Sequence, residues 1–240
     1  MSNTTKPTPT SLSNSQQTLL ITLYGRHLDS LSPHPILADP FSSLVIQRIN
    51  YDFPTLAAGN GTQVVVSTRS RHFDERISSF LAHCKEKGDD VTVVQLGCGL
   101  DTRSHRVQWG GQGVRWIDVD LPEVIALRRA AMPDLPPAPD GKKREYSTVS
   151  GSATEEGLIK GLPNDGVTLV VMEGLAAYLD PDEGRRMVGV VCEHFGKRGG
   201  EVLVDTAGRL TGWISGVFGY IWRVKGRVGL ELRPKRDVEE

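Results

Sequence analysis

The stretch VVQLGCGLDTR, from Val93 to Arg103, decides the fold of this 240-residue chain. It begins with β-branched and apolar residues, which are typical of a buried strand, and it ends in a turn that holds Gly97 and Gly99. Ligands of open α/β sheets bind at the carboxyl ends of the strands, most often beside the turn after the first strand. Glycine in such a turn tolerates positive φ and lets backbone N–H groups approach a ligand closely. The stretch therefore predicts the first strand of an α/β sheet and a nucleotide-like ligand beside its turn.

The third position of the glycine pattern separates two classes of ligand. A dinucleotide site requires GxGxxG, because the third glycine lets helix and strand pack while the pyrophosphate lies at the helix N-terminus. This chain has Thr102 at that position. Since a ligand without a pyrophosphate makes no such demand, the turn favours S-adenosylmethionine over NAD. An NAD-dependent oxidoreductase is the weaker alternative.

Two acids in the next apolar stretch, GVRWIDVDLPEV, match the second half of this signature. Asp118 and Asp120 lie about 20 residues past the glycine turn, which is the spacing of an acid that binds ribose hydroxyls. Side chains two positions apart on a strand point to the same side, so both acids are expected at the exit of this strand. The alternative is that one of them caps the helix that opens at Pro122.

From Val91 onward the sequence alternates between strand and helix patterns, which predicts an α/β fold with a doubly wound, mostly parallel sheet. The expected strands are Val91–Leu96, Val114–Val119, Glu145–Val149, Val167–Met172 and Glu201–Asp205. Helical spacing predicts the connecting helices Glu123–Ala131, Thr154–Lys160 and Glu183–Phe195.

The flanks of the sheet differ in composition. Residues 1–17 are rich in Ser, Thr, Pro and Asn and predict a disordered tail, whereas helical apolar spacing from Thr18 to Lys87 predicts an N-terminal helical cap. We expect one domain over residues 18–240, made of a cap (18–90), a cofactor-binding sheet (91–206) and a C-terminal segment (207–240). Only about 35 residues follow the fifth strand, so the C-terminus is expected to be shortened. The segment's aromatic residues are expected to fill a core or, alternatively, to wall an acceptor pocket: Trp213, Phe218, Tyr220 and Trp222.

The composition excludes several classes of partner. A formal net charge of -1 gives no reason to expect nucleic acid or anionic lipid, and no apolar run reaches the length of a membrane helix. Cys84, Cys98 and Cys192 lack the spacing of a disulfide framework or a zinc site, so we expect no metal and a reducing, cytoplasmic compartment.

Three motifs together resemble the leucine carboxyl methyltransferase family, in the branch of polyketide-type O-methyltransferases. They are LGCGLDTRSHRV, WIDVDLPEVIALRR and MEGLAAYLDPDE, and the stretches TLLITLYGRHLDSLSPHPILADP and STRSRHFDE fit the N-terminal region of the same family. The resemblance covers about residues 18–206. It implies a class I methyltransferase fold and S-adenosyl-L-methionine as the cofactor.

The resemblance also implies roles for individual residues. Arg69 resembles the arginine that pairs with the methionine carboxylate of the cofactor, and an arginine fork suits a carboxylate. Gly97 and Gly99 resemble the turn beneath the cofactor, and Asp120 resembles the ribose acid. The remaining matches are Ser152 and Ala153 at the adenine and Glu173 beside the cofactor. No residue is nominated as a catalytic base.

The expected function is methyl transfer from S-adenosylmethionine to a carboxylate or hydroxyl of a small, polyketide-like metabolite of secondary metabolism. Such a transfer depends mainly on alignment of acceptor, methyl and sulfur, which explains how a site can lack an obvious nucleophile. Two alternatives remain, which are methylation of a protein's C-terminal carboxylate and a non-catalytic relative that only binds the cofactor. The sequence does not indicate an oligomeric state.

Overall fold

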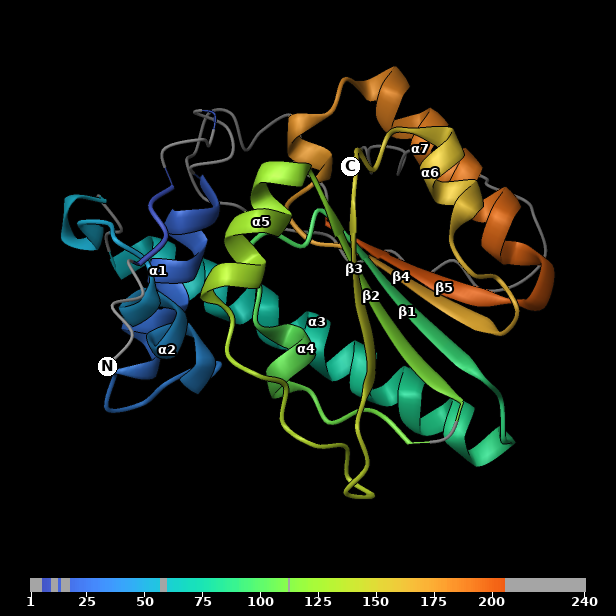
Figure 1. The fold of residues 1–240 in the computed structure, drawn as a ribbon, viewed down its shortest axis with the longest axis horizontal. Helices are drawn as coiled ribbons and strands as arrows, with labels where there is room; N and C mark the ends of the chain where they lie inside the picture. The colour runs from blue at the N-terminus through green and yellow to red at the C-terminus, as the bar shows by residue number, and fades with distance from the viewer. Residues whose placement is uncertain (1–5, 10–12, 14–17, 57–59, 112, 206–240) are drawn as a thin grey trace, which may run out of the picture.

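Five parallel strands form the centre of the molecule, with helices on both faces and a helical unit at one end (Figure 1). The computed structural model describes residues 6–9, 13, 18–56, 60–111 and 113–205. The strands are β1 (Val91–Leu96), β2 (Val114–Asp120), β3 (Glu145–Ser150), β4 (Val167–Met172) and β5 (Gly200–Val204). They agree with the five predicted strands to within one residue at each end.

The strand order is β3-β2-β1-β4-β5, and every neighbouring pair is parallel. The order reverses beside β1, because the chain first builds outward through β2 and β3 and then crosses to β4. In such sheets the connections that follow the two neighbouring strands, here β1 and β4, lead to opposite sides and open a crevice between their carboxyl ends. The glycine turn that follows β1 lies at this point, and the predicted fold class is confirmed.

The two faces of the sheet are buried by different helices, as the alternation of side chains along a strand requires. Val93, Trp116 and Val171 pack on α3 (Asn60–Lys87), whose Phe73 and Ile77 are fully buried. Val94 and Val170 belong to the opposite face. That face is covered by α6 (Glu156–Gly161) and α7 (Pro181–Phe195).

The predicted N-terminal cap, residues 18–90, contains α1 (Thr18–Ser30), α2 (Pro40–Arg48), the short turn η1 (Phe53–Thr55) and α3, of which α3 covers one face of the sheet. The other three elements form the helical unit at the end of the sheet. Leu20, Leu23 and Val45 form a third buried cluster with Leu100 of the glycine turn. Side chains of α5 (Pro122–Ala131) complete this cluster. The cap is therefore packed directly on the turn that ends β1.

Two local features differ from the predicted elements. The helix expected from Thr154 begins at Glu156, because the Ser152 hydroxyl accepts from the Thr154 N–H and the Ser152 carbonyl accepts from the Glu155 N–H, which forms a turn first. The short helix α4 (Arg103–Arg106), which follows the glycine turn, was not predicted. Four residues are too few to show a helical period.

Predictions at the two ends of the chain concern residues that are mostly outside the described part. Within the predicted tail, the Asn50 N–H donates to the Pro7 carbonyl at 2.9 Å, and residues 1–5, 10–12 and 14–17 lie outside the described part. The predicted C-terminal segment and its aromatic residues Trp213, Phe218, Tyr220 and Trp222 lie outside the described residues. No helix of the described part is both long and apolar enough to cross a membrane.

Candidate cofactor site

The glycine turn has the backbone that its sequence requires. Gly97 and Gly99 have φ of +67° and +50°, in the left-handed region where a side chain is strained. The N–H groups of Gly97 and Cys98 donate to the Val119 carbonyl at 2.9 and 3.1 Å, so the turn is fixed to β2. A Cβ on Gly97 would approach the side chain of Leu175 to 3.1 Å. Glycine at this position therefore fits both the positive φ of the backbone and the small space below Leu175.

Asp120 ends β2 beside this turn, in the position expected of a ribose acid. Its Oδ2 accepts from the Gly99 N–H and its Oδ1 from the Leu121 N–H, both at 2.7 Å. Burial raises the pKa of this carboxyl, although the two backbone N–H groups act in the opposite direction. Each carboxylate oxygen has more than one lone pair, so Asp120 retains acceptor capacity for ligand hydroxyls.

Asp118 lies deeper than this surface, and its predicted contact with the cofactor stays a prediction. It is fully buried, and its carboxylate accepts from Trp116 Nε1 at 2.8 Å and Tyr146 Oη at 2.6 Å and pairs with Arg128. Asp118 and Asp120 do point to one side of β2, but Asp118 lies one pleat further into the sheet, where a polar network uses its lone pairs. The helix-cap alternative is not observed, because no side chain caps α5.

Arg69 projects from α3 toward the ends of β4 and β5. Its Nε donates to Glu173 Oε1 at 2.9 Å and its Nη1 to Asp205 Oδ2 at 3.0 Å. The Arg69 side chain is 14% exposed, whereas that of Arg71 is 57% exposed, so Arg69 is not a solvated surface charge. Burial alone lowers the pKa of Arg69, but Glu173 and Asp205 more than offset this effect and raise it.

Glu173, the first residue after β4, is held ionised by three donors. Ser70 Oγ donates to its Oε1 at 2.9 Å, next to Arg69 Nε, and Arg103 binds its other oxygen, Oε2. Burial alone raises the pKa of Glu173, but the guanidinium groups of Arg103 and Arg69 outweigh burial and lower it. A buried carboxylate with such partners remains an anion at neutral pH.

Arg103 connects this end of the site to the glycine turn. The residue is fully buried, with Nε 2.7 Å from Asp74 Oδ1 and Nη1 2.8 Å from Asp101 Oδ2. Its guanidinium carbon also lies 5.3 Å from the ring centroid of Phe73. Arg103 therefore ties α3, the turn and the end of β4 together.

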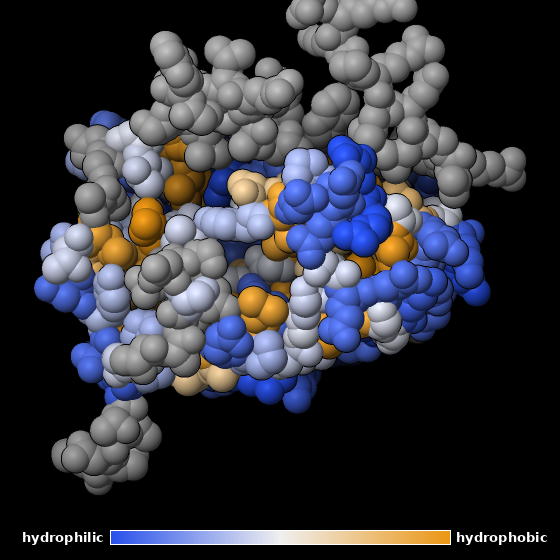
Figure 2. Space-filling view, turned by 90° about the horizontal axis from the view of Figure 1, so that it is seen from above, coloured by the Kyte–Doolittle hydropathy of each residue, from blue (hydrophilic) through white to orange (hydrophobic). Residues whose placement is uncertain are grey.

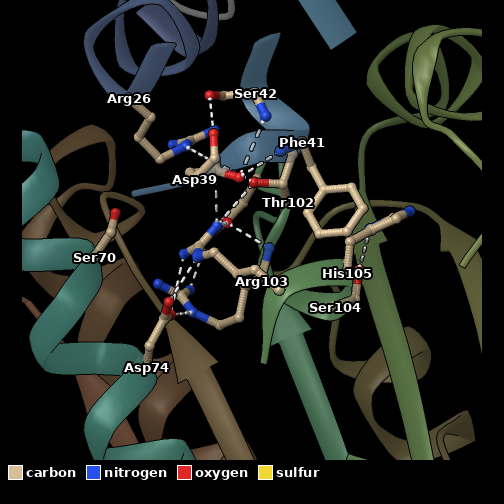
Figure 3. A network of polar contacts seen from close by, with 12 residues as sticks. Arg26, Asp39, Phe41, Ser42, Ser70, Asp74, Thr102, Arg103, Ser104 and His105 are labelled. Atoms are coloured by element: carbon tan, nitrogen blue, oxygen red, sulfur yellow. Dashed lines mark hydrogen bonds and ion pairs between the residues drawn. The ribbon is translucent and has the colours of Figure 1, made fainter. Parts of the chain in front are cut away.

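The same network continues into the cap through Asp39, as Figure 3 shows. This carboxylate caps α2, accepts from the Thr102 hydroxyl, and lies 3.3 Å from Arg26 Nε and 3.6 Å from Arg106 Nη1. Thr102, which stands where a dinucleotide site has its third glycine, thus anchors the cap to the turn. A glycine could not provide this hydroxyl.

Ser152 and Ala153 follow β3 on the same side of the sheet. The Gly151 N–H donates to the Asp120 carbonyl at 2.9 Å, which brings this loop beside the predicted ribose acid. Ser152 Oγ and Thr154 Oγ1 lie 2.9 Å apart. The Ala153 side chain packs into the core, so only its backbone is available to a ligand. Their predicted adenine contacts stay predictions.

A protein-family model matches most of the chain, including the elements that form this site. A family model described as leucine carboxyl methyltransferase matches residues 20–191, from the cap through the glycine turn and β4 into α7. The chain belongs to the leucine carboxyl methyltransferase family. The predicted family is therefore confirmed.

Relatives of this family member share its expected enzyme class. The chain is 34% identical over 211 residues to the S-adenosyl-L-methionine-dependent methyltransferase dpfgK of Gibberella zeae, covering 83% of this chain and 68% of that protein. It is 36% identical over 183 residues to the tetracenomycin polyketide synthesis O-methyltransferase TcmP of Streptomyces glaucescens, covering 76% and 63%. This family member thus spans about two thirds of the length of these relatives. The solved structure of an O-methyltransferase family protein from Burkholderia thailandensis aligns over 82% of this chain and 54% of that chain, with 16% identity and a TM-score of 0.44.

In this leucine carboxyl methyltransferase family member, most of the predicted residues lie at the carboxyl edge of the sheet. Seen from above Figure 1, this side of the molecule is hollowed near its middle, with hydrophobic and polar residues around the hollow (Figure 2). Sequence analysis missed seven of the nine charged residues of the network: Arg26, Asp39, Asp74, Asp101, Arg103, Arg106 and Asp205. Asp205 had a usable signal, since it directly follows the fifth predicted strand at the same edge. The others had none: Asp101 pairs with Arg103 and Arg106 of its own stretch, but the ion pairs that join these residues to α3, the cap and β4 link distant parts of the chain.

Proposed function

We propose that the protein is an S-adenosyl-L-methionine-dependent O-methyltransferase that acts on a carboxylate or hydroxyl of a small metabolite. One observation supports this most strongly, which is that Asp120 and the Arg69–Glu173 pair flank the glycine turn after β1. This arrangement offers hydroxyl acceptors at one end and a charged pair at the other. The names of the relatives support both the enzyme class and the cofactor.

The charge of the network fits a cationic cofactor. Among the described residues, the ion pairs link five carboxylates to four guanidinium groups in one continuous chain that runs from Arg26 to Asp205. This leaves one formal negative charge. S-adenosylmethionine carries a sulfonium, an ammonium and a carboxylate, so its formal charge of about +1 would balance the charge of this network, as buried charges require.

Five of the predicted residues have defined roles in this proposal. Asp120 accepts hydrogen bonds from the ribose hydroxyls, and the loop at Ser152 and Ala153 lies against the adenine. Arg69 pairs with the methionine carboxylate, and Glu173 accepts from the ammonium. Within the described part of the chain, Arg69 Nη2 has no hydrogen-bond partner, which leaves a donor for that carboxylate.

Catalysis in this site consists of positioning. When bound, S-adenosylmethionine supplies an electrophilic methyl group. The chain's own residues orient the two reactants and exclude water, and Leu175 and Leu19 contribute apolar surface directly above the two glycines. Alignment of this kind is worth roughly 7 to 11 kcal/mol. A carboxylate acceptor needs no general base, because it is already ionised at neutral pH.

The metabolite acceptor is favoured by the polyketide O-methyltransferase among the relatives. Methyl transfer from labelled S-adenosylmethionine to a cell extract, sorted into protein and small-molecule fractions, tests this point. We expect label in the small-molecule fraction with the parent and none with Gly97→Val. Label in a protein fraction would support the protein carboxyl methyltransferase instead, and label in neither fraction would support a non-catalytic relative.

The proposal includes a location for the protein, which is the reducing environment of the cytoplasm. Cys84, Cys98 and Cys192 are free thiols, and burial raises the pKa of each of them, most strongly for Cys98. Among the described residues, no group of His, Cys, Asp or Glu is arranged to hold a metal ion. The proposed reaction uses no metal, and the partner is a small molecule rather than a nucleic acid.

A further inference from the structure

Asp205, the residue that follows β5, contacts both parts of the site that would receive the amino-acid end of the cofactor. Its Oδ2 accepts from Arg69 Nη1 at 3.0 Å, and its Oδ1 accepts from the Gly174 N–H at 2.6 Å. The residue is only 5% exposed. A carboxylate this buried must find partners. One partner, Arg69, is a predicted cofactor residue, and the other, Gly174, directly follows the predicted residue Glu173.

The contact with Gly174 fixes the loop that carries Glu173. Gly174 has φ of +73°, a conformation in which a non-glycine residue is strained. The hydrogen bond from its N–H to Asp205 holds this turn, so the preceding Glu173 side chain is directed at Arg69 and Ser70. A Cβ on Gly174 would lie 3.6 Å from Arg69 Nη2, so glycine here also leaves that nitrogen uncovered.

The contact with Arg69 decides how the guanidinium is oriented. Its Nε is used by Glu173 and its Nη1 by Asp205, so two carboxylates hold the plane from two sides. A guanidinium that meets a single carboxylate prefers a bidentate pair with two parallel N–H bonds. Without Asp205, Arg69 would be free to turn and give a second nitrogen to Glu173, and its fork would then no longer face a ligand.

We propose that Asp205 is a positioning residue of the cofactor site, which orients Arg69 so that Nη2 faces the methionine carboxylate of S-adenosylmethionine. This inference rests on the proposed function, because it assumes that the ligand of Arg69 is that carboxylate. Asp205 touches neither the cofactor nor the reacting atoms in this account. It acts through Arg69 and the Gly174 loop.

The test compares two ligands that differ only at the amino-acid end. S-adenosylhomocysteine has the methionine-type carboxylate and ammonium, whereas 5′-methylthioadenosine keeps adenine and ribose but lacks both groups. For Asp205→Asn, we expect the affinity for S-adenosylhomocysteine to fall about tenfold, as for loss of a charged hydrogen bond, and that for methylthioadenosine to change less than about twofold. The Asn side chain still accepts from Gly174, so this variant removes chiefly the contact with Arg69.

Glu201→Gln is the matched control, because Glu201 lies on β5, the strand that Asp205 follows. Glu201 Oε2 lies 3.5 Å from Arg76 Nη2, and Arg76 is not part of the candidate site. It should bind both ligands like the parent. Asp205→Ala, which also loses the Gly174 contact, should weaken S-adenosylhomocysteine more than Asp205→Asn does. If Asp205→Ala fails to fold, Asp205→Asn alone decides.

Two results would overturn the inference in different ways. Equal losses for both ligands in Asp205→Asn, or no loss for either, would mean that Asp205 only supports the end of β5. If the parent binds neither ligand, the proposed function itself fails and the inference falls with it.

Discussion

The two ends of the candidate site are built in contrasting ways. At the ribose end, Asp120 is held by the backbone N–H groups of Gly99 and Leu121, which are 21 and 1 residues away in sequence. At the methionine end, Arg69 is held by side chains 104 and 136 residues away, Glu173 and Asp205. The register of neighbouring strands thus places the first acid, whereas tertiary packing places the second group of charges. The ribose end should therefore respond to mutation through one residue, and the methionine end through several.

The glycine turn is common to both ends, so its loss should have the largest effect. Gly97→Val places a β-branched residue at a φ of +67° and brings its Cβ to 3.1 Å from Leu175. We expect binding of S-adenosylhomocysteine and of methylthioadenosine to fall more than about 100-fold, since the strain and the overlap each cost on the order of 1–3 kcal/mol. Calorimetric titration measures both affinities. Parent-like binding of either ligand would place the site elsewhere.

Loss of the arginine should separate the two ends. Arg69→Met keeps an apolar stem but leaves Glu173 and Asp205 without this guanidinium. We expect the affinity for S-adenosylhomocysteine to fall roughly 30- to 100-fold, because a charged pair with the ligand is lost. Methylthioadenosine should lose less than about threefold, since it has no carboxylate for Arg69. Arg71→Met is the matched control, as Arg71 is exposed on the same helix and should leave both affinities unchanged. A comparable loss for both ligands would contradict the division of the site into two ends.

Loss of the Asp120 carboxylate should weaken binding less than loss of Arg69 weakens S-adenosylhomocysteine, and it should weaken both ligands equally. Asp120→Asn keeps one acceptor oxygen but removes the negative charge of the carboxylate. The Gly99 N–H donates to this carboxylate, and the ligand hydroxyls are expected to do so as well. We expect both ligands to lose affinity about tenfold, because both contain ribose. Titration of the two ligands side by side measures this. A loss confined to S-adenosylhomocysteine would show that Asp120 contacts the amino-acid end instead.

A mildly acidic pH should produce the smallest change in ligand affinity. Burial raises the pKa of Asp120, so its carboxylate gains a proton at a higher pH than an exposed aspartate does, and a protonated carboxyl is the poorer acceptor. Glu173 has a lowered pKa and stays ionised over the same range. The affinity for methylthioadenosine should thus fall as the pH decreases from about 8 to about 5, by roughly two- to threefold. Asp120→Asn should abolish this dependence, and a slope that persists in this variant would assign it to another group.

The sequence predicted what depends on local pattern. Strand periodicity and the glycine turn were enough for the sheet and for the edge at which Asp120 lies. Asp118, predicted beside Asp120, lies deeper in the sheet. Alternation gives the side of a strand to which a side chain points, but not whether other side chains already use its carboxylate. Arg128 and Tyr146, which use it, come from α5 and β3.

The methionine end was predictable only in part. The resemblance to a family indicated Arg69 and Glu173, but spacing alone could not pair residues 104 positions apart. Arg103 lies within the stretch that decides the fold, yet its contacts with Asp74 and Glu173 depend on how α3 crosses the sheet. Thr102 was noted as the absence of a glycine, and the structure gives it a positive role as the donor to Asp39.

Calorimetric titration of the full chain with S-adenosylhomocysteine, with NAD as the comparison ligand, tests the central claim most directly. The account predicts saturable binding of one S-adenosylhomocysteine per chain and no binding of NAD, because Thr102 occupies the third glycine position. Absence of S-adenosylhomocysteine binding at high micromolar concentration, or tight binding of NAD in its place, would contradict it.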